Sequence, residues 1–253
     1  MFQRWFQQYR SVVSIQAATT VARRMRRALI VAVALTALAP LLLSAAATDD
    51  DICVNGTRQS PIDITSTTQR KLPVLKFAYS TRPLTLADDG HTVRVRFDNS
   101  STLHIGGERY RLQQFHFHTP GGDRVNGEDF PMAAHLLHKS TSGQLLAVVA
   151  LFRLGAENPV LSRLMPLIPP LANGDHSYPH ILINPADLLP ARLDYYRYAG
   201  SLTASPCTEG VDWIVLKQPL TLSPAQLASY RKRFADNARA VQPLHHRVVL
   251  ESQ

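Results

Sequence analysis

The feature that most constrains this chain is the segment 113–138, QQFHFHTPGGDRVNGEDFPMAAHLLH, which places four histidines in otherwise apolar surroundings. Successive side chains of an extended strand point to opposite faces, so His116 and His118 share one face while Phe115 and Phe117 take the other. Two imidazoles on one face of a strand can bind the same metal ion. The segment is therefore predicted to contain a strand that carries a metal site.

A third imidazole can come from the next apolar run, MAAHLLH, if the loop TPGGDRVNGEDFP turns the chain back and lays His135 or His138 beside the pair. Three histidines leave one position of a tetrahedral zinc ion open, which is typical of catalytic rather than structural sites. A cupin-type metal oxygenase is an alternative, because its site also uses an HxH pair, together with a nearby glutamate. No glutamate occurs in the nine residues after His118, and iron or manganese in place of zinc would identify that class.

The first 47 residues differ from the rest of the chain. An apolar run from Ala28 to Leu43 follows four closely spaced arginines and precedes small residues, with Ala45 and Ala47 in the pattern of a cleavage site. The run is too short and too rich in alanine to favour a transmembrane helix. Residues 1–47 are therefore predicted to be a secretory signal peptide, with an uncleaved anchor as the alternative and Met25 as a second candidate start. The protein is expected to be periplasmic or secreted, with no stable membrane span after cleavage.

Removing this leader changes the charge of the chain. The leader holds six of the 27 basic residues and none of the 19 acidic ones, so the remainder carries a net charge of +2 instead of +8. So small a net charge gives no reason to expect a nucleic acid partner. Cys53 and Cys207 both follow the leader, and two cysteines in an exported chain most simply form one disulfide bond.

The chain after the leader is predicted to be one mainly β domain, residues 48–253. HTVRVRF (residues 91–97) alternates between apolar and basic residues, as in a strand with one solvated face, whereas LLAVVALF (145–152) is apolar on both faces and is expected in the middle of a sheet. Helices are expected only in ENPVLSRLMPLI, broken by Pro166, and in SPAQLASYRKRF. The polar residues 48–63 are expected to form an irregular segment over the surface, held by Cys53.

Several separated motifs resemble the alpha-class carbonic anhydrases, in order and with family-like spacing. They are QSPIDI (59–64), DDGHTV (88–93), QFHFHTP (114–120), MAAHLLHK (132–139), the segment 195–217 and NARAVQPLHHR (237–247). The resemblance implies a single domain around a large, twisted, mostly antiparallel sheet with a few short surface helices, and a conical cavity with zinc at its floor. It also implies reversible hydration of carbon dioxide to bicarbonate and a proton. Carbonic anhydrase is the standard example of zinc lowering the pKa of its bound water to about 7.

The resemblance assigns roles to individual residues of these motifs. His116, His118 and His135 are the implied zinc ligands, which leaves His138 outside the site. His91 is implied as the proton shuttle, because a histidine can exchange protons near neutral pH. The remaining implied residues are Thr203, which accepts the hydrogen bond of the zinc-bound hydroxide; Gln114 and Asn237 behind the ligands; and Leu137, Val148, Leu202 and Trp213, which form the apolar pocket for carbon dioxide.

Two positions depart from the family's pattern. Family members usually have TPSEH where this chain has TPGGD, so the glutamate that holds the threonine hydroxyl is replaced by Gly122. A second glutamate, which normally holds the outer nitrogen of the last ligand, is replaced by Ala133. Asp123 is next to Gly122 but is not expected to replace the glutamate missing there, because adjacent residues of extended backbone face opposite ways.

Two functions follow from this pattern. The first is an exported zinc carbonate dehydratase with reduced activity, since losing the groups behind a catalytic hydroxide can cost on the order of 10²–10³ in rate. The second is a catalytically impaired carbonic anhydrase-related protein that only binds zinc. Carbon dioxide and bicarbonate are the expected partners, and a homodimer is kept as an option for the assembly.

Overall fold

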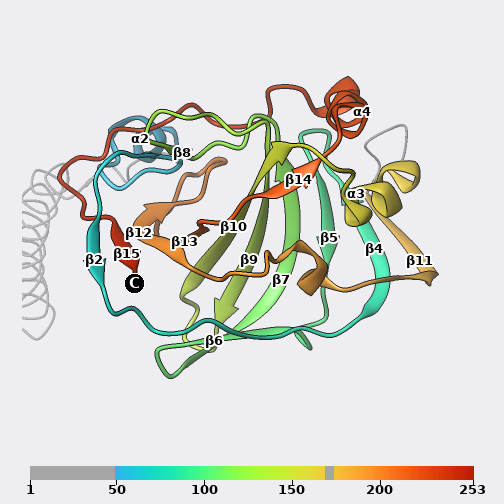
Figure 1. The fold of residues 1–253 in the computed structure, drawn as a ribbon, viewed down its shortest axis with the longest axis horizontal. Coiled ribbons are helices and arrows are strands. Elements are labelled where there is room, and N and C mark those ends of the chain that lie inside the picture. Colours follow the sequence, from blue (N-terminus) through green and yellow to red (C-terminus); the bar gives the residue numbers. More distant parts are fainter. Residues whose placement is uncertain (1–48, 169–173) are drawn as a thin grey trace, which may run out of the picture. The chain divides into compact units, whose positions relative to one another are not determined.

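A sheet of thirteen strands organises residues 49–168 and 174–253, the parts of the chain that this computed structural model describes (Figure 1). Its strands are β2 (Thr68–Arg70), β3 (Lys76–Ala78), β4 (Arg82–Asp88), β5 (Val93–Arg96), β6 (Thr102–Ile105), β7 (Glu108–His118), β9 (Met132–Ser140), β10 (Leu145–Leu154), β11 (Gly174–Ile183), β12 (Tyr195–Ser201), β13 (Glu209–Leu216), β14 (Leu220–Leu222) and β15 (Leu250–Ser252). Two further short strands, β1 (Asp63–Ile64) and β8 (Arg124–Val125), pair in parallel with each other.

The strand order is β11-β4-β5-β7-β9-β10-β13-β12-β15-β2, with β3, β6 and β14 off this path. Most neighbours are antiparallel, while β10 is parallel to β13 and β14, and β15 is parallel to β2. Figure 1 shows β5, β7, β9 and β10 side by side in the centre of the sheet. The mainly β, single-domain architecture expected from the sequence is therefore confirmed.

The central position of β10 follows from its composition. The strand pairs with β9 on one edge and β13 on the other, and consecutive residues along most of its length are buried, so both of its faces are covered, as expected for a run that is apolar on both sides. Leu146, Val148 and Ala150 enter the larger core cluster, together with Phe115 and Phe117 of β7. The alternate residues of β10 enter a second cluster, which contains Tyr198 and Trp213 among its members. The sheet therefore separates two cores, and the face that a side chain takes decides which core it joins.

Short helices lie outside the sheet in both segments where the sequence predicts them. They are α3 (Pro159–Leu164), continued by the 3₁₀ turn η2 (Met165–Leu167), and α4 (Pro224–Phe234). A second 3₁₀ turn, η3 (Pro185–Leu188), is not predicted by the sequence. Ser223 caps α4 in a capping box with Gln226, and Pro224 opens the helix. Gln226 also accepts a hydrogen bond at 2.9 Å from the backbone N–H of Asn158, the cap of α3, so one side chain joins the two helix starts.

One helix is not anticipated by the sequence pattern. The segment expected to be irregular contains α2 (Asp49–Asn55), and the predicted disulfide bond joins Cys53 of this helix to Cys207. Arg239 donates hydrogen bonds to the backbone oxygens of Cys53 and Ser60, at 2.6 and 3.1 Å. Tertiary contacts of this kind stabilise a helix that is too short to be stable by its own propensity.

The predicted signal peptide, residues 1–47, and the alternative start at Met25 lie outside the described residues. Within residues 49–168 and 174–253, none of the helices has the length and the apolar character that crossing a membrane requires.

Replacing both cysteines by serine is expected to lower the free energy of unfolding by about 2–5 kcal/mol, because the bridge joins residues 154 positions apart and restricts the unfolded chain. Urea unfolding with and without a reductant measures this effect. Reductant should destabilise the unchanged protein and have no effect on the doubly substituted one. Equal stability of the two proteins under oxidising conditions would contradict the prediction.

Candidate metal centre

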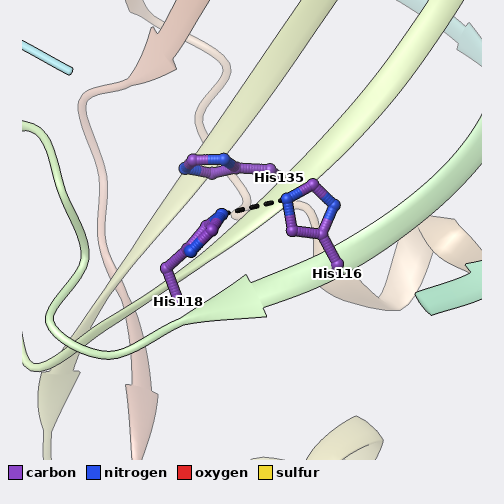
Figure 2. Close-up of side chains that lie close together, drawn as sticks. All are labelled: His116, His118 and His135. Carbon is purple, nitrogen blue, oxygen red and sulfur yellow. Dashed lines mark hydrogen bonds between the residues drawn. The ribbon is translucent and has the colours of Figure 1, made fainter. Parts of the chain in front are cut away.

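The register between β7 and β9 brings three histidines together. His116 lies opposite His135, and His118 lies opposite Ala133 on the same antiparallel pair. The ring nitrogens of His116, His118 and His135 that could bind a metal all lie within 4.8 Å of one another. Figure 2 shows the three imidazoles converging from the two strands.

Hydrogen bonds on the outer side of two rings determine which nitrogen faces the centre. His116 Nδ1 lies 2.9 Å from the side-chain oxygen of Gln114, and His118 Nδ1 lies 3.1 Å from the backbone oxygen of Asn237. Both partner atoms are oxygens that only accept, so each Nδ1 carries the ring proton. The Nε2 atom of each ring is therefore left with a free lone pair, as a metal ligand requires.

The two Nε2 atoms also lie close to each other. The Nε2 atoms of His116 and His118 are 3.0 Å apart, along the dashed line in Figure 2. Two acceptor nitrogens cannot form a hydrogen bond with each other, whereas a cation between them satisfies both. Two imidazole nitrogens on one tetrahedral zinc ion lie about 3.3 Å apart, close to the observed separation.

The electrostatic state of the three rings also suits a metal. Burial lowers the pKa of His116, His118 and His135 below the usual value, and the neighbouring imidazoles lower the pKa values of His116 and His135 further. The rings are consequently neutral at physiological pH, which is the form that binds a metal. The donor set and its protonation both fit zinc.

His135 differs from the other two ligand candidates. Its Nε2 atom is buried and has no hydrogen-bond partner among the described residues, and its ring lies edge-on to Trp213 with the centroids 5.1 Å apart. This is the consequence expected of Ala133, which cannot supply the carboxylate found in the family's pattern. The outer nitrogen of His135 is thus the one position in the triad that no described protein group holds.

Two residues of the triad, His116 and His118, line a cavity of about 920 Å³ that most of the residues implied by the sequence also line. His91, Thr203, Gln114 and Asn237 line this cavity. Leu137 and Leu202 contribute apolar side chains to the same lining.

Asn237 connects the turn that carries His91 to the ligand His118. Its side-chain nitrogen donates to the backbone oxygen of His91 at 2.8 Å, while its own backbone oxygen receives the hydrogen bond from His118. The turn is also held by Asp89, whose carboxylate accepts the backbone N–H groups of His91 and Thr92 at 3.0 and 2.9 Å. The backbone of His91 is therefore fixed, while its side chain is exposed to the cavity.

Thr203 has no hydrogen-bond partner among the described residues, as the loss of the family glutamate predicts. Gly122, at the position of that glutamate, has a φ angle of +85°, a conformation that side chains rarely adopt. Replacing Gly122 with glutamate would therefore strain the backbone, although an added Cβ would meet only Pro61, at an ordinary 3.5 Å. The loop therefore lacks the glutamate side chain and also has a backbone conformation at residue 122 that glutamate rarely adopts.

The expected apolar pocket needs one correction. Leu137 and Leu202 line the cavity, and Trp213 lies behind His135, but Val148 lies in the larger core cluster on the opposite face of the sheet. Ala147 lies opposite Leu137 and joins the cluster of Trp213. A shift of one residue along a strand moves a side chain to the other face, and an all-apolar strand carries no alternation that would reveal the error.

His138 lies outside the triad. It is fully buried, and its Nε2 atom is 2.7 Å from the hydroxyl of Tyr79. Burial lowers its pKa to about 4, so the ring is neutral in the folded protein.

Asp123 occupies a position that the sequence pattern does not reveal. Its side chain is buried, and one carboxylate oxygen accepts hydrogen bonds from the backbone N–H of Ile62 at 2.9 Å and from the hydroxyl of Tyr198 at 2.8 Å. Burial raises the pKa of Asp123 to about 6, an effect that these two hydrogen bonds and the charge of Arg247 only partly oppose. No feature of TPGGD predicts this, because Tyr198 is 75 positions away.

The comparison with known proteins agrees with this geometry. Residues 46–253 match the family model described as eukaryotic-type carbonic anhydrase. The chain is 42% identical over 205 residues to a carbonic anhydrase of Klebsiella pneumoniae, covering 79% of this chain and 82% of that protein. It is 40% identical over 206 residues to a carbonic anhydrase of Neisseria gonorrhoeae, covering 79% of each. The solved alpha-carbonic anhydrase of Photobacterium profundum is 39% identical, with a TM-score of 0.75 over 79% of this chain and 92% of that one.

The raised pKa of Asp123 predicts a pH-dependent stability of the metal-free protein. The carboxyl group of Asp123 loses its proton near pH 4 in the unfolded chain and near pH 6 in the folded one. Its contribution to the free energy of unfolding is therefore fully present below pH 4 and is lost as the pH rises through 6. Asparagine does not ionise, so Asp123→Asn should not lose stability in this way. The free energy of unfolding of the variant, relative to that of the unchanged protein, should rise by up to about 3 kcal/mol between pH 4 and pH 7.

Urea unfolding of both proteins in a chelator across this range measures the difference. Asp129→Asn, which alters an exposed carboxylate paired with Arg124, is the matched control and should show no comparable gain. A constant difference between Asp123→Asn and the unchanged protein from pH 4 to pH 7 would contradict the prediction.

Proposed function

The chain belongs to the alpha-class, or eukaryotic-type, carbonic anhydrase family, and on that premise we propose that it catalyses the reversible hydration of carbon dioxide to bicarbonate and a proton. The observation that carries the proposal is the group of three neutral histidines, two of which line the same cavity as Thr203 and His91. Because the alpha-carbonic anhydrases use zinc and the donor set fits it, His116, His118 and His135 are the proposed ligands.

Zinc in such a site supplies a water molecule acidic enough to lose its proton near neutral pH and attack carbon dioxide, the effect for which carbonic anhydrase is the standard example. Gln114 and the backbone of Asn237 keep the ring protons of two ligands on Nδ1 and so direct Nε2 inward. Leu137 and Leu202 offer an apolar wall for the uncharged substrate.

His91 is the proposed acceptor of the proton that the reaction releases. Its ring is exposed and lines the same cavity, so a proton can reach it through cavity water and leave to buffer. The fixed backbone of the turn keeps the ring at the cavity while the side chain remains free to rotate.

We expect the activity to be lower than in relatives that have both glutamates. The hydroxyl of Thr203 has no described acceptor to orient it, and the outer nitrogen of His135 is unsupported. Removing one preorganised group of this kind typically costs about 10²–10³ in rate. These same two observations favour the second candidate function, a zinc-binding protein without significant turnover.

The disulfide bond supports the further proposal that the protein is exported to the periplasm or secreted, since such bonds persist in oxidising compartments.

The enzyme hypothesis predicts about one zinc ion per chain and carbon dioxide hydration above the buffer rate for purified residues 48–253. His116→Ala should lose most of both, because two imidazoles bind zinc more weakly than three. Metal analysis and stopped-flow hydration on the same samples provide the measurement. One zinc ion per chain without hydration above the buffer rate would contradict the enzyme hypothesis and favour the zinc-binding protein.

His91→Ala is expected to lower kcat in dilute buffer several-fold, leave kcat/KM nearly unchanged, and recover with added imidazole, because only proton export depends on this ring. His104→Ala is the matched control, since His104 is exposed but lines a different cavity. Turnover that does not depend on buffer in either variant would remove His91 from the proton path.

A further inference from the structure

Two buried polar atoms without partners belong to residues near Ala133, the position where the family's pattern has a carboxylate: one is on the same strand and the other is on the preceding loop. They are Oδ2 of Asp123 and Nε2 of His135, both without a hydrogen-bond partner among the described residues. Burying a polar group without a partner is costly, and such groups in native proteins usually bind each other or an internal water molecule. A carboxylate oxygen accepts a hydrogen bond and an imidazole N–H donates one, so these two atoms are chemically complementary.

The surroundings place both atoms at one small cluster. The hydroxyl of Tyr198 donates to Oδ1 of Asp123 at 2.8 Å, and the Tyr198 ring stacks on Trp213 with centroids 6.0 Å apart and planes 12° apart. The ring of His135 lies edge-on to the same Trp213. Ala133, which is fully buried, packs in this cluster with Tyr198 and Trp213.

Resting on the proposed zinc function, we propose that Asp123 is the positioning residue behind His135. Its Oδ2 atom accepts a hydrogen bond from a buried water molecule, and the oxygen of that water accepts a hydrogen bond from the Nε2–H group of His135. This connection holds the ring proton on the outer nitrogen and leaves the Nδ1 lone pair for the metal. The methyl group of Ala133 is small enough to leave the water a place beside the ring.

The role fits the position of Asp123 in the fold. The loop that follows His118 brings the carboxylate to Tyr198, whose ring stacks on the Trp213 that His135 also contacts. Ile62 and Tyr198 hold one of its oxygens and leave the other without a partner among the described residues. An ionised carboxylate is the strongest acceptor that a protein can offer to a ligand imidazole. The carboxylate that is missing from β9 is thus supplied from the neighbouring loop.

A purely structural role for Asp123 makes different predictions. In that case the carboxylate only braces Ile62 and Tyr198, so its removal should weaken the metal-free fold and affect zinc only as far as the fold is weakened. Asp123→Asn tests this, because the amide oxygen can still accept both hydrogen bonds while the second oxygen becomes a donor. Tyr198→Phe is the matched control, since it removes one of the two hydrogen bonds of the brace, while the backbone N–H of Ile62 still holds Oδ1 and the carboxylate remains.

The experiment measures zinc affinity of residues 48–253 by competition with a coloured chelator at pH 8, and the melting temperature of the same proteins without metal. We expect Asp123→Asn to bind zinc about 10–100-fold more weakly with no fall in the metal-free melting temperature, and Tyr198→Phe to stay within about threefold of the unchanged protein. Unchanged affinity in Asp123→Asn, or an equal loss in Tyr198→Phe, would overturn the proposal.

A second variant gives an independent test. Adding Ala133→Glu to Asp123→Asn returns a carboxylate to the strand, and zinc affinity should recover by at least about tenfold, whereas Ala133→Gln in the same background should not restore it. A folded Ala133→Glu double variant without recovery would count against the proposal. Failure of the unchanged protein to bind zinc would refute the proposed function itself, while tight zinc binding that Asp123→Asn leaves intact would refute only the role of Asp123.

Discussion

The metal centre depends on one register, the antiparallel pairing of β7 with β9. This pairing sets His116 opposite His135, and the register shift between Leu112 and Gln114 accommodates an extra residue just before the ligand pair. A slip of one residue would turn His135 towards the larger core and destroy the triad. The buried aromatic residues on the other face of β7 oppose such a slip, because they would be driven out of the core.

The walls of the cavity come from segments far from the triad in sequence. Asn237, 119 positions after His118, supplies the acceptor for that ligand and also holds the turn of His91. Arg239, two residues further on, lines the cavity and binds the segment that the disulfide bond anchors. Two paired strands therefore carry the three histidines, while hydrogen bonds between loops hold the turn of His91 at the cavity.

The loss of two carboxylates affects the two sides of the site differently. Near Thr203 the change extends to the backbone, because Gly122 adopts a conformation that a glutamate does not favour. Behind His135 the change is confined to the absence of a side chain, and a buried aspartate lies at the same cluster of aromatic rings. The first loss is accompanied by a different backbone conformation at residue 122, whereas the second leaves the outer nitrogen of His135 without a described partner.

The sequence by itself determined the features that depend on local pattern: the shared face of His116 and His118, the mainly β content, the capped helix α4 and the pairing of the two cysteines. From the residues alone it could not choose between His135 and His138, and it placed Val148 on the wrong face, because an apolar run has no alternation to indicate direction. It also missed α2 and the burial of Asp123. Only the tertiary structure decided these points, because strand register, short anchored helices and buried polar contacts depend on residues from separate segments of the chain.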